Sequence, residues 1–162
     1  MERAETITIR PLGFVRSPRR ELRDDDWGEV VARIELGPEF GPESLYGLEE
    51  FSHAEVLFYF DRVATDRVEH GARHPRGNTD WPRVGIFAQR AKDRPNRIGS
   101  TIVEILAREE HALVVRGLDA VEGTPVLDVK PVMVEFLPRT PVRQPAWSRE
   151  LMKSYWRNEE PG

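Results

Sequence analysis

The sequence predicts a mainly-β fold, a compact single-domain β-barrel with short helices and a C-terminal helical tail. Short segments of apolar residues alternate or run together at strand length. Pro and Gly residues, 13 and 12 of them, separate these segments as turns do. Because no Gly-x-Gly-x-x-Gly follows a strand, a doubly wound α/β sheet is not predicted. Many short strands favour a closed or nearly closed barrel instead.

Apolar patterning places the elements in chain order. The first strand alternates around Ile7 and Ile9, although Pro11 indicates an edge or a bend. The second alternates as a half-buried strand does, and the third is nearly all apolar, which indicates cover on both faces. A short helical turn and a long loop are expected at residues 42–48 and 64–83. The expected strands are residues 6–14, 30–36, 54–60, 84–88, 98–106, 112–118 and 126–136, the last bent or ended by Pro131.

The C-terminal tail has a helical pattern. Trp147, Leu151 and Tyr155 recur at i, i+4 and i+8, which predicts an amphipathic helix over residues 145–157. The apolar stripe predicts a homodimer contact, or a helix that folds back on its own barrel. The expected organisation is therefore a barrel domain at residues 1–140 and a tail at residues 141–162.

Composition fits one globular domain. Hydrophobic residues make up 39% and charged residues 32%, and no apolar run approaches the roughly 20 residues of a membrane helix. The first five residues lack the basic-then-apolar pattern of a secretion signal, which favours the cytoplasm. With no cysteine, the sequence has neither a thiolate nucleophile nor a cysteine zinc site.

Positive charge is concentrated in one part of the sequence. Residues 62–97 hold nine Arg or Lys against four Asp or Glu, although the formal net charge of the chain is -4. Such asymmetry suits a basic face that binds phosphates, or else a solvated, charged loop. Four of these cations, at positions 90, 92, 94 and 97, share one short loop beside apolar runs. Because guanidinium groups suit carboxylates and phosphates, we interpret this loop as an anion-recognition site.

Four blocks, in order, resemble the TsaA-like (TrmO-type) family. They read Leu-Gly-Phe-Val-Arg-Ser-Pro at residues 12–18, Leu-Glu-Glu-Phe-Ser-His at 48–53, Gly-Ile-Phe-Ala-Gln-Arg…Arg-Pro-Asn-Arg-Ile-Gly at 85–99, and Leu-Asp-Ala-Val-Glu-Gly-Thr-Pro-Val-Leu-Asp-Val-Lys-Pro at 118–131. The resemblance implies a compact β-barrel that uses S-adenosyl-L-methionine and no metal. It further implies N-methylation of N6 of threonylcarbamoyladenosine beside the anticodon of tRNA. Two alternatives stay open: methylation of a small metabolite or natural product, and a non-catalytic cofactor-binding or RNA-binding barrel.

The resemblance also implies the roles of individual residues. Arg94, Asn96 and Arg97 are implied to bind the substrate, while no catalytic base is identified beyond the candidates Asp128, Lys130 and His53. The implied cofactor-binding residues are Ser17, Pro18, Arg19, Ser52, His53, Arg90, Ser100, Gly117, Leu118 and Asp119.

Simpler roles compete with some of these assignments. Arg90 and Asp93 have the spacing of a surface ion pair of little energetic value. Asp128 and Lys130, two residues apart on one strand face, have the spacing of another. Asp119 is of a residue type that is common in turns.

The histidines allow further alternatives. Ser52 and His53 have the pattern of a strand cap and a buried imidazole. His70 and His74 have the i, i+4 spacing of zinc ligands, but the glycines and prolines around them disfavour a helix, and no third ligand is evident. A Ser-His-Asp hydrolase built from Ser52, His53 and Asp128 lacks the nucleophile-elbow context.

The sequence departs from the family pattern in two ways. Arg97 stands where a proline is usual, which frees the backbone of the loop and adds a cation. The chain also looks like a short form without the additional C-terminal domain of tRNA-modifying members. These departures leave open whether it binds tRNA in the same way, binds it as a dimer, or acts on a smaller acceptor.

Overall fold

The computed structural model describes residue 3 and residues 5–158, and the fold is mainly β as predicted. The strands are β1 (Gly13–Arg16), β2 (Val31–Leu36), β3 (His53–Tyr59), β4 (Ala72–Arg73), β5 (Val84–Gly85), β6 (Ile98–Arg108), β7 (Ala112–Arg116) and β8 (Pro125–Pro131). The helices are the short 3-10 turns η1 (Pro42–Leu45), η2 (Leu48–Glu50), η3 (Thr65–Arg67), η4 (Pro75–Gly77), η5 (Ile86–Ala88), η6 (Pro95–Arg97) and η7 (Val134–Phe136), and the α-helix α1 (Ala146–Leu151).

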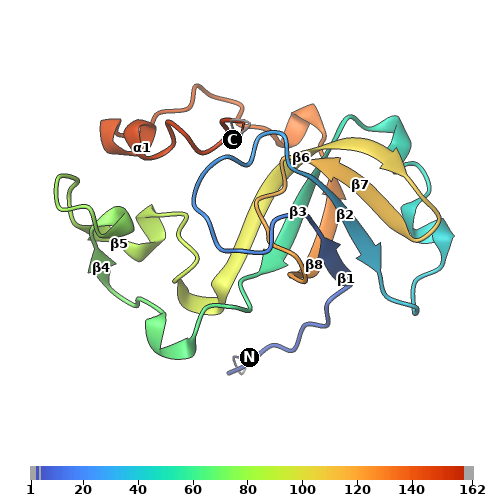
Figure 1. The fold of residues 1–162 in the computed structure, drawn as a ribbon, viewed down its shortest axis with the longest axis horizontal. Coiled ribbons are helices and arrows are strands. Elements are labelled where there is room, and N and C mark those ends of the chain that lie inside the picture. Colours follow the sequence, from blue (N-terminus) through green and yellow to red (C-terminus); the bar gives the residue numbers. More distant parts are fainter. Residues whose placement is uncertain (1–2, 4, 159–162) are drawn as a thin grey trace.

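Six strands form a closed ring. They hydrogen-bond in the order β1-β2-β7-β6-β3-β8, every pair is antiparallel, and β8 pairs back with β1. A sheet that closes on itself has no free edge inviting further strands. The two-residue strands β4 and β5 form a separate small sheet, which lies outside the ring next to α1 (Figure 1). No helix in the described part of the chain has the length and apolar character needed to cross a membrane.

The interior of the ring is filled with apolar side chains. In β3, Ala54, Val56 and Phe58 are buried, while the residues between them face outward. This two-residue alternation is that of a strand buried on one face, so the expected cover on both faces of this strand is wrong. Gly99 lies where a Cβ would overlap the rings of Phe58 and Phe60, so the absence of a side chain makes room for these aromatics. The rest of the cluster is Val15, Ala32, Ile34, Val103, Leu113, Val115, Leu118, Ala120 and Val126.

Three strand predictions differ most from the structure in their bounds. The first strand starts at Gly13, and the preceding Ile7 and Ile9 are 82% and 55% exposed, because no neighbouring strand pairs with them. The strand expected at residues 84–88 is two residues long before η5 begins at Ile86. The last strand ends at Pro131, as that proline indicated, and the apolar residues at positions 133, 134, 136 and 137 are exposed. The helical turn expected at residues 42–48 is present as η1 and the start of η2.

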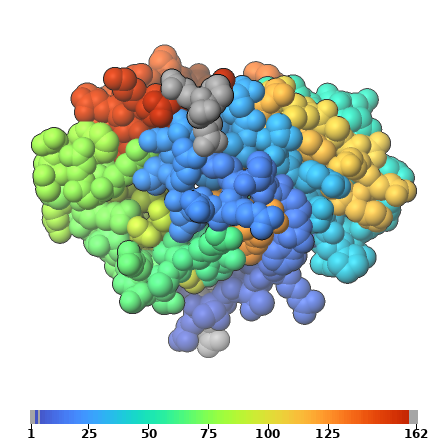
Figure 2. All heavy atoms as spheres, in the orientation of Figure 1, coloured from blue at the N-terminus to red at the C-terminus, as the bar shows by residue number. Residues whose placement is uncertain are grey.

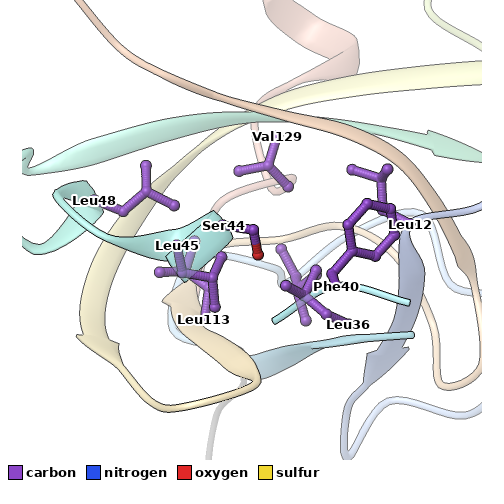
Figure 3. A pocket seen from close by; sticks show the side chains of 9 residues that line it. Leu12, Leu36, Phe40, Ser44, Leu45, Leu48, Leu113 and Val129 are labelled. Atoms are coloured by element: carbon purple, nitrogen blue, oxygen red, sulfur yellow. The ribbon is translucent and has the colours of Figure 1, made fainter. Parts of the chain in front are cut away.

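The ring has two ends with different characters. At the Asp119 end, β1, β3 and β7 finish while β2, β6 and β8 begin. At the opposite end, the His53 end, β3 begins and β8 finishes. A small apolar hollow of about 140 Å³ opens near the His53 end, with Ser44 as its one polar lining residue (Figure 3). Its other lining residues are Leu12, Ile34, Leu36, Phe40, Leu45, Leu48, Leu113 and Val129.

Candidate functional site

The Asp119 end of the ring gathers most of the predicted cofactor-binding residues. Gly117, Leu118 and Asp119 continue the chain beyond β7, and Ser100 lies near the start of β6. The segment from Ser17 to Arg19 follows β1 at the same end. Antiparallel pairing therefore brings together segments that are about 100 residues apart in the sequence.

At this end, the carboxylate of Asp119 accepts hydrogen bonds from two hydroxyl groups. Its Oδ1 accepts a hydrogen bond from Thr101 Oγ1 at 2.5 Å, and its Oδ2 accepts one from the hydroxyl of Tyr155. Burial raises the pKa of the Asp119 carboxyl, while the two hydroxyl donors and the nearby Arg90 charge oppose this rise. Burial and the Asp119 charge also raise the pKa of Tyr155, so its hydroxyl stays protonated and donates. The turn role considered for Asp119 is thus accompanied by a specific side-chain network.

Arg90 is positioned by β6. Its Nη2 donates to the Ser100 carbonyl at 2.5 Å and lies 3.3 Å from the Ser100 hydroxyl. The surface ion pair with Asp93 does not form, because Asp93 pairs instead with Arg73 at 2.9 Å. Since a guanidinium has five N–H donors, Arg90 keeps donors for a ligand carboxylate.

The segment after β1 is built into the fold. Arg19 is buried, and its guanidinium donates to the carbonyls of Asp25 and Asp26 while it stacks 4.1 Å from the ring of Trp27. The amide of Ser17 donates to Glu122, and this bond is the main cause of the lowered pKa of that carboxyl. The side chain of Arg19 thus shapes the loop between β1 and β2.

Ser52 and His53 lie at the other end of the ring. Ser52 Oγ is 2.6 Å from His53 Nδ1, and both residues are exposed, so His53 is not the buried imidazole considered above. Register places His53 opposite Glu104 of β6. Glu104 lies about 10 Å along the strand from Thr101 and on the outer face of the ring. Within one chain, these two residues are therefore separated from Asp119.

Asp128 and Lys130 also lie on the outer face of the ring. They pair in register with Leu57 and Glu55 of β3, whose side chains alternate with the buried ones. Their side chains form the ion pair that their spacing allows, at 2.7 Å. The Lys130 pKa is raised by this partner. Asp128 and Lys130 do not contribute to the ring interior.

The basic loop is anchored by backbone carbonyls. Arg94 donates to the carbonyl of Gln89 at 2.5 Å, and Arg97 donates to that of Val63 at 2.6 Å and to the Tyr59 hydroxyl. Within the described residues, neither arginine has a carboxylate at ion-pair distance. Because a carbonyl carries no net charge, the loop keeps its positive charge.

The backbone at position 97 does not suit proline. Asn96 and Arg97 both have positive φ angles, 62° and 50°. Proline is restricted to φ near about −65°, so it could not adopt this conformation at position 97. Of the three predicted substrate-binding residues, Asn96 is exposed, whereas the two arginines are half-buried.

The histidines of the long loop are not arranged as ligands. His74 Nδ1 is 2.7 Å from the carbonyl oxygen of Trp81. Among residues 5–158, no group of three or more His, Cys, Asp or Glu side chains is placed to hold a metal ion.

Sequence reasoning missed Thr101 and assigned Tyr155 to a different role. Thr101 is one position beyond the predicted Ser100, and strand alternation directs it inward toward Asp119. Tyr155 enters the sequence pattern only as part of the tail stripe. In the structure α1 ends at Leu151, earlier than predicted, and Trp147, Leu151 and Tyr155 are half-buried. The tail folds back on its own chain, which was the alternative to a dimer contact.

Comparison with known proteins shows the family of this chain. Residues 18–136 match the model of the tRNA-methyltransferase O N-terminal domain. An S-adenosyl-L-methionine-binding protein of Archaeoglobus fulgidus is 34% identical over 128 residues, which cover 76% of this chain and 88% of that protein. The human tRNA (adenine(37)-N6)-methyltransferase is 37% identical over 107 residues, which cover 66% of this chain and 23% of the human protein.

The fold agrees with solved structures of the same kind. The crystal structure of TrmO from Pseudomonas aeruginosa superposes with a TM-score of 0.67 at 30% sequence identity, covering 85% of this chain and 61% of that chain. The present chain thus spans less than two thirds of that TrmO and about a quarter of the human enzyme. The match of the domain model over residues 18–136, together with these likenesses, shows that the chain belongs to the tRNA-methyltransferase O (TrmO) family.

Proposed function

We propose that this chain is an S-adenosyl-L-methionine-dependent N-methyltransferase that methylates N6 of threonylcarbamoyladenosine next to the anticodon of tRNA. Family membership supports the enzyme class and the cofactor. The observation that carries the proposal is the meeting, at one end of the ring, of the Asp119 cluster with a loop that keeps its positive charge. A tRNA acceptor would place the protein in the cytoplasm.

The side chains at the Asp119 end fit this cofactor. S-adenosyl-L-methionine has an ammonium, a carboxylate and ribose hydroxyls, and it supplies an electrophilic methyl group on a sulfonium. Asp119 offers a carboxylate to a donor of the cofactor, and Arg90 offers N–H donors to its carboxylate. Two residues of β6 hold these side chains: Ser100 contacts Arg90, and Thr101 donates to Asp119. Holding the reactants in position before the reaction accounts for much of the rate of a displacement. The closed ring supports the compact β-barrel expected at residues 1–140, with residues 141–162 as its tail.

The first prediction is that the protein binds S-adenosyl-L-methionine in the presence of a chelator and methylates tRNA. Calorimetry with EDTA should show binding, and mass spectrometry of tRNA nucleosides should show the N6-methyl product in a complemented deletion strain but not in the deletion strain. Absence of binding at millimolar cofactor would contradict the proposal. Binding with methylation of a small amine but not of tRNA would favour the metabolite alternative, and binding without any transfer would favour the non-catalytic one.

We further propose that two copies form a homodimer through the His53 end. The amide of Val132 donates to the carbonyl of His53, and next to this contact Val134 and Phe136 are 76% and 86% exposed. Exposed apolar patches of this kind commonly mark interfaces. A two-fold contact would bury this patch in both copies.

The second prediction is that the full chain is a dimer at tens of micromolar and that Phe136→Ser makes it monomeric. Chain removal after Arg143 should leave the dimer intact, because the tail packs on its own chain. Light scattering measures both. A monomeric wild-type protein contradicts the dimer, and a dimer lost only on truncation moves the interface to the tail.

A further inference from the structure

The C-terminal tail is docked on the site by contacts from several segments. We call residues 150–157 the docked tail. Figure 2 shows it in red against the segment before β5 and the loop between β1 and β2. Trp81 Nε1 donates to Glu150 Oε2 at 2.7 Å. At the other end of the docked tail, Arg157 Nε donates to Asp26 Oδ1 at 2.9 Å.

Backbone bonds hold Tyr155 in place on both sides. The amide of Asp26 donates to the Ser154 carbonyl at 3.1 Å, and the amide of Trp27 donates to the Tyr155 carbonyl at 2.8 Å. Gly28 lies directly beside Trp156, the residue after Tyr155. A Cβ added at Gly28 would overlap the carbonyl oxygen of Trp156. The loop thus approaches the tail as closely as only glycine permits, and this observation is independent of the hydrogen bonds.

We infer, on the basis of the proposed function, that the docked tail completes the cofactor site of this chain. Tyr155 is a positioning residue: its hydroxyl fixes the carboxylate of Asp119 so that it receives one donor group of S-adenosyl-L-methionine. The family domain match ends at residue 136, so this contribution comes from outside the matched segment.

The acceptor capacity of Asp119 defines what it binds. An ionised carboxylate has about four acceptor positions. Thr101 and Tyr155 occupy two of them, one on each carboxylate oxygen. The remaining acceptor positions suit an ammonium or hydroxyl donor of the cofactor. The positive charge of Arg90 lowers the pKa of Asp119 and that of Tyr155. The positive charge of Arg76 also lowers the pKa of Tyr155.

The third prediction tests this role with Tyr155→Phe, which removes only the hydroxyl. Calorimetry should show cofactor affinity reduced by about three- to tenfold at pH 7, because Asp119 loses a charge-assisted partner. Gly28→Ala should act in the same direction, since it displaces the tail without touching Asp119 or Tyr155. Tyr46→Phe is the matched control, because Tyr46 is exposed and lies beside Arg108, away from the tail. It should bind like the wild type.

A second measurement needs no cofactor. Carbon-13 NMR of the Asp119 carboxyl should show a higher pKa in Tyr155→Phe than in the wild type, because one hydrogen bond that lowers this pKa is lost. As the pH is lowered, the cofactor affinity of that variant should accordingly begin to fall at a higher pH than the affinity of the wild type does. Unchanged affinity and pH profile would overturn the inference, and tighter binding would show that the tail blocks the site. If the wild type binds no cofactor, the proposed function fails, while the NMR titration still reports whether Tyr155 controls Asp119.

Discussion

Replacing Asp119 with asparagine is expected to weaken binding of S-adenosyl-L-methionine strongly while the fold is kept. The substitution preserves the shape of the side chain but removes the charge that, in the proposed site, faces the cationic cofactor. A hydrogen bond to a charged group contributes about 1.5–3 kcal/mol, which corresponds to roughly a 10- to 150-fold loss of affinity. Calorimetry of the variant at pH 7 measures this loss. Arg90→Ala should show a loss of the same order, because it removes the donors held beside Ser100.

The stability of the same variant provides the control. Burial holds the pKa of Asp119 above its ordinary value of 3.8, so the folded protein keeps this proton to a higher pH than the unfolded chain does. Wild-type stability therefore loses the contribution of this group as pH rises from about 3.8 through the folded pKa. The amide introduced by Asp119→Asn does not titrate, so the melting temperature of the variant relative to the wild type should increase over that window. Normal cofactor binding by a folded Asp119→Asn variant would contradict the assignment of Asp119 to the cofactor.

Strand patterning predicted the ring well because burial on one face leaves a direct trace in the sequence. The alternation in residues 30–36 and the apolar run at 54–60 correspond to β2 and β3, which line the interior. The same rule failed at Ile7 and Ile9, where alternation occurs without a neighbouring strand. Apolar alternation indicates that a segment can be buried on one face. The segment is buried only where a neighbouring strand pairs with it.

The grouping of site residues could not be predicted in the same way. Family motifs named Ser52 and Asp119 together, but strand direction places them at opposite ends of the ring. The sequence likewise contains Tyr155 as one member of an apolar stripe, and nothing in its spacing indicates a hydrogen bond to Asp119. Such contacts depend on how the loop at Asp26 meets the tail, where Asp26 itself has a positive φ of 69°.

The wild-type protein is expected to bind tRNA with an affinity that falls steeply with salt, and the double variant Arg67→Gln, Arg83→Gln should weaken that binding. Both arginines are exposed in the basic segment, and their side chains make no hydrogen bond or ion pair with another described residue. They are therefore free to contact phosphates at little structural cost. Two surface contacts of about 0.5–1 kcal/mol each correspond to roughly five- to thirtyfold in affinity.

The salt dependence distinguishes phosphate contacts from a general loss of charge. Each phosphate contact removed should reduce the slope of log affinity against log salt by about 1, so the double variant should lose about 2. The matched control is Arg139→Gln, Arg143→Gln, which makes the same change in net charge on exposed residues after β8. Filter binding or fluorescence anisotropy at several salt concentrations measures both slopes. If the control variant lowers affinity and slope as much as the Arg67 and Arg83 variant does, tRNA responds to total charge, and the basic segment is not its binding surface.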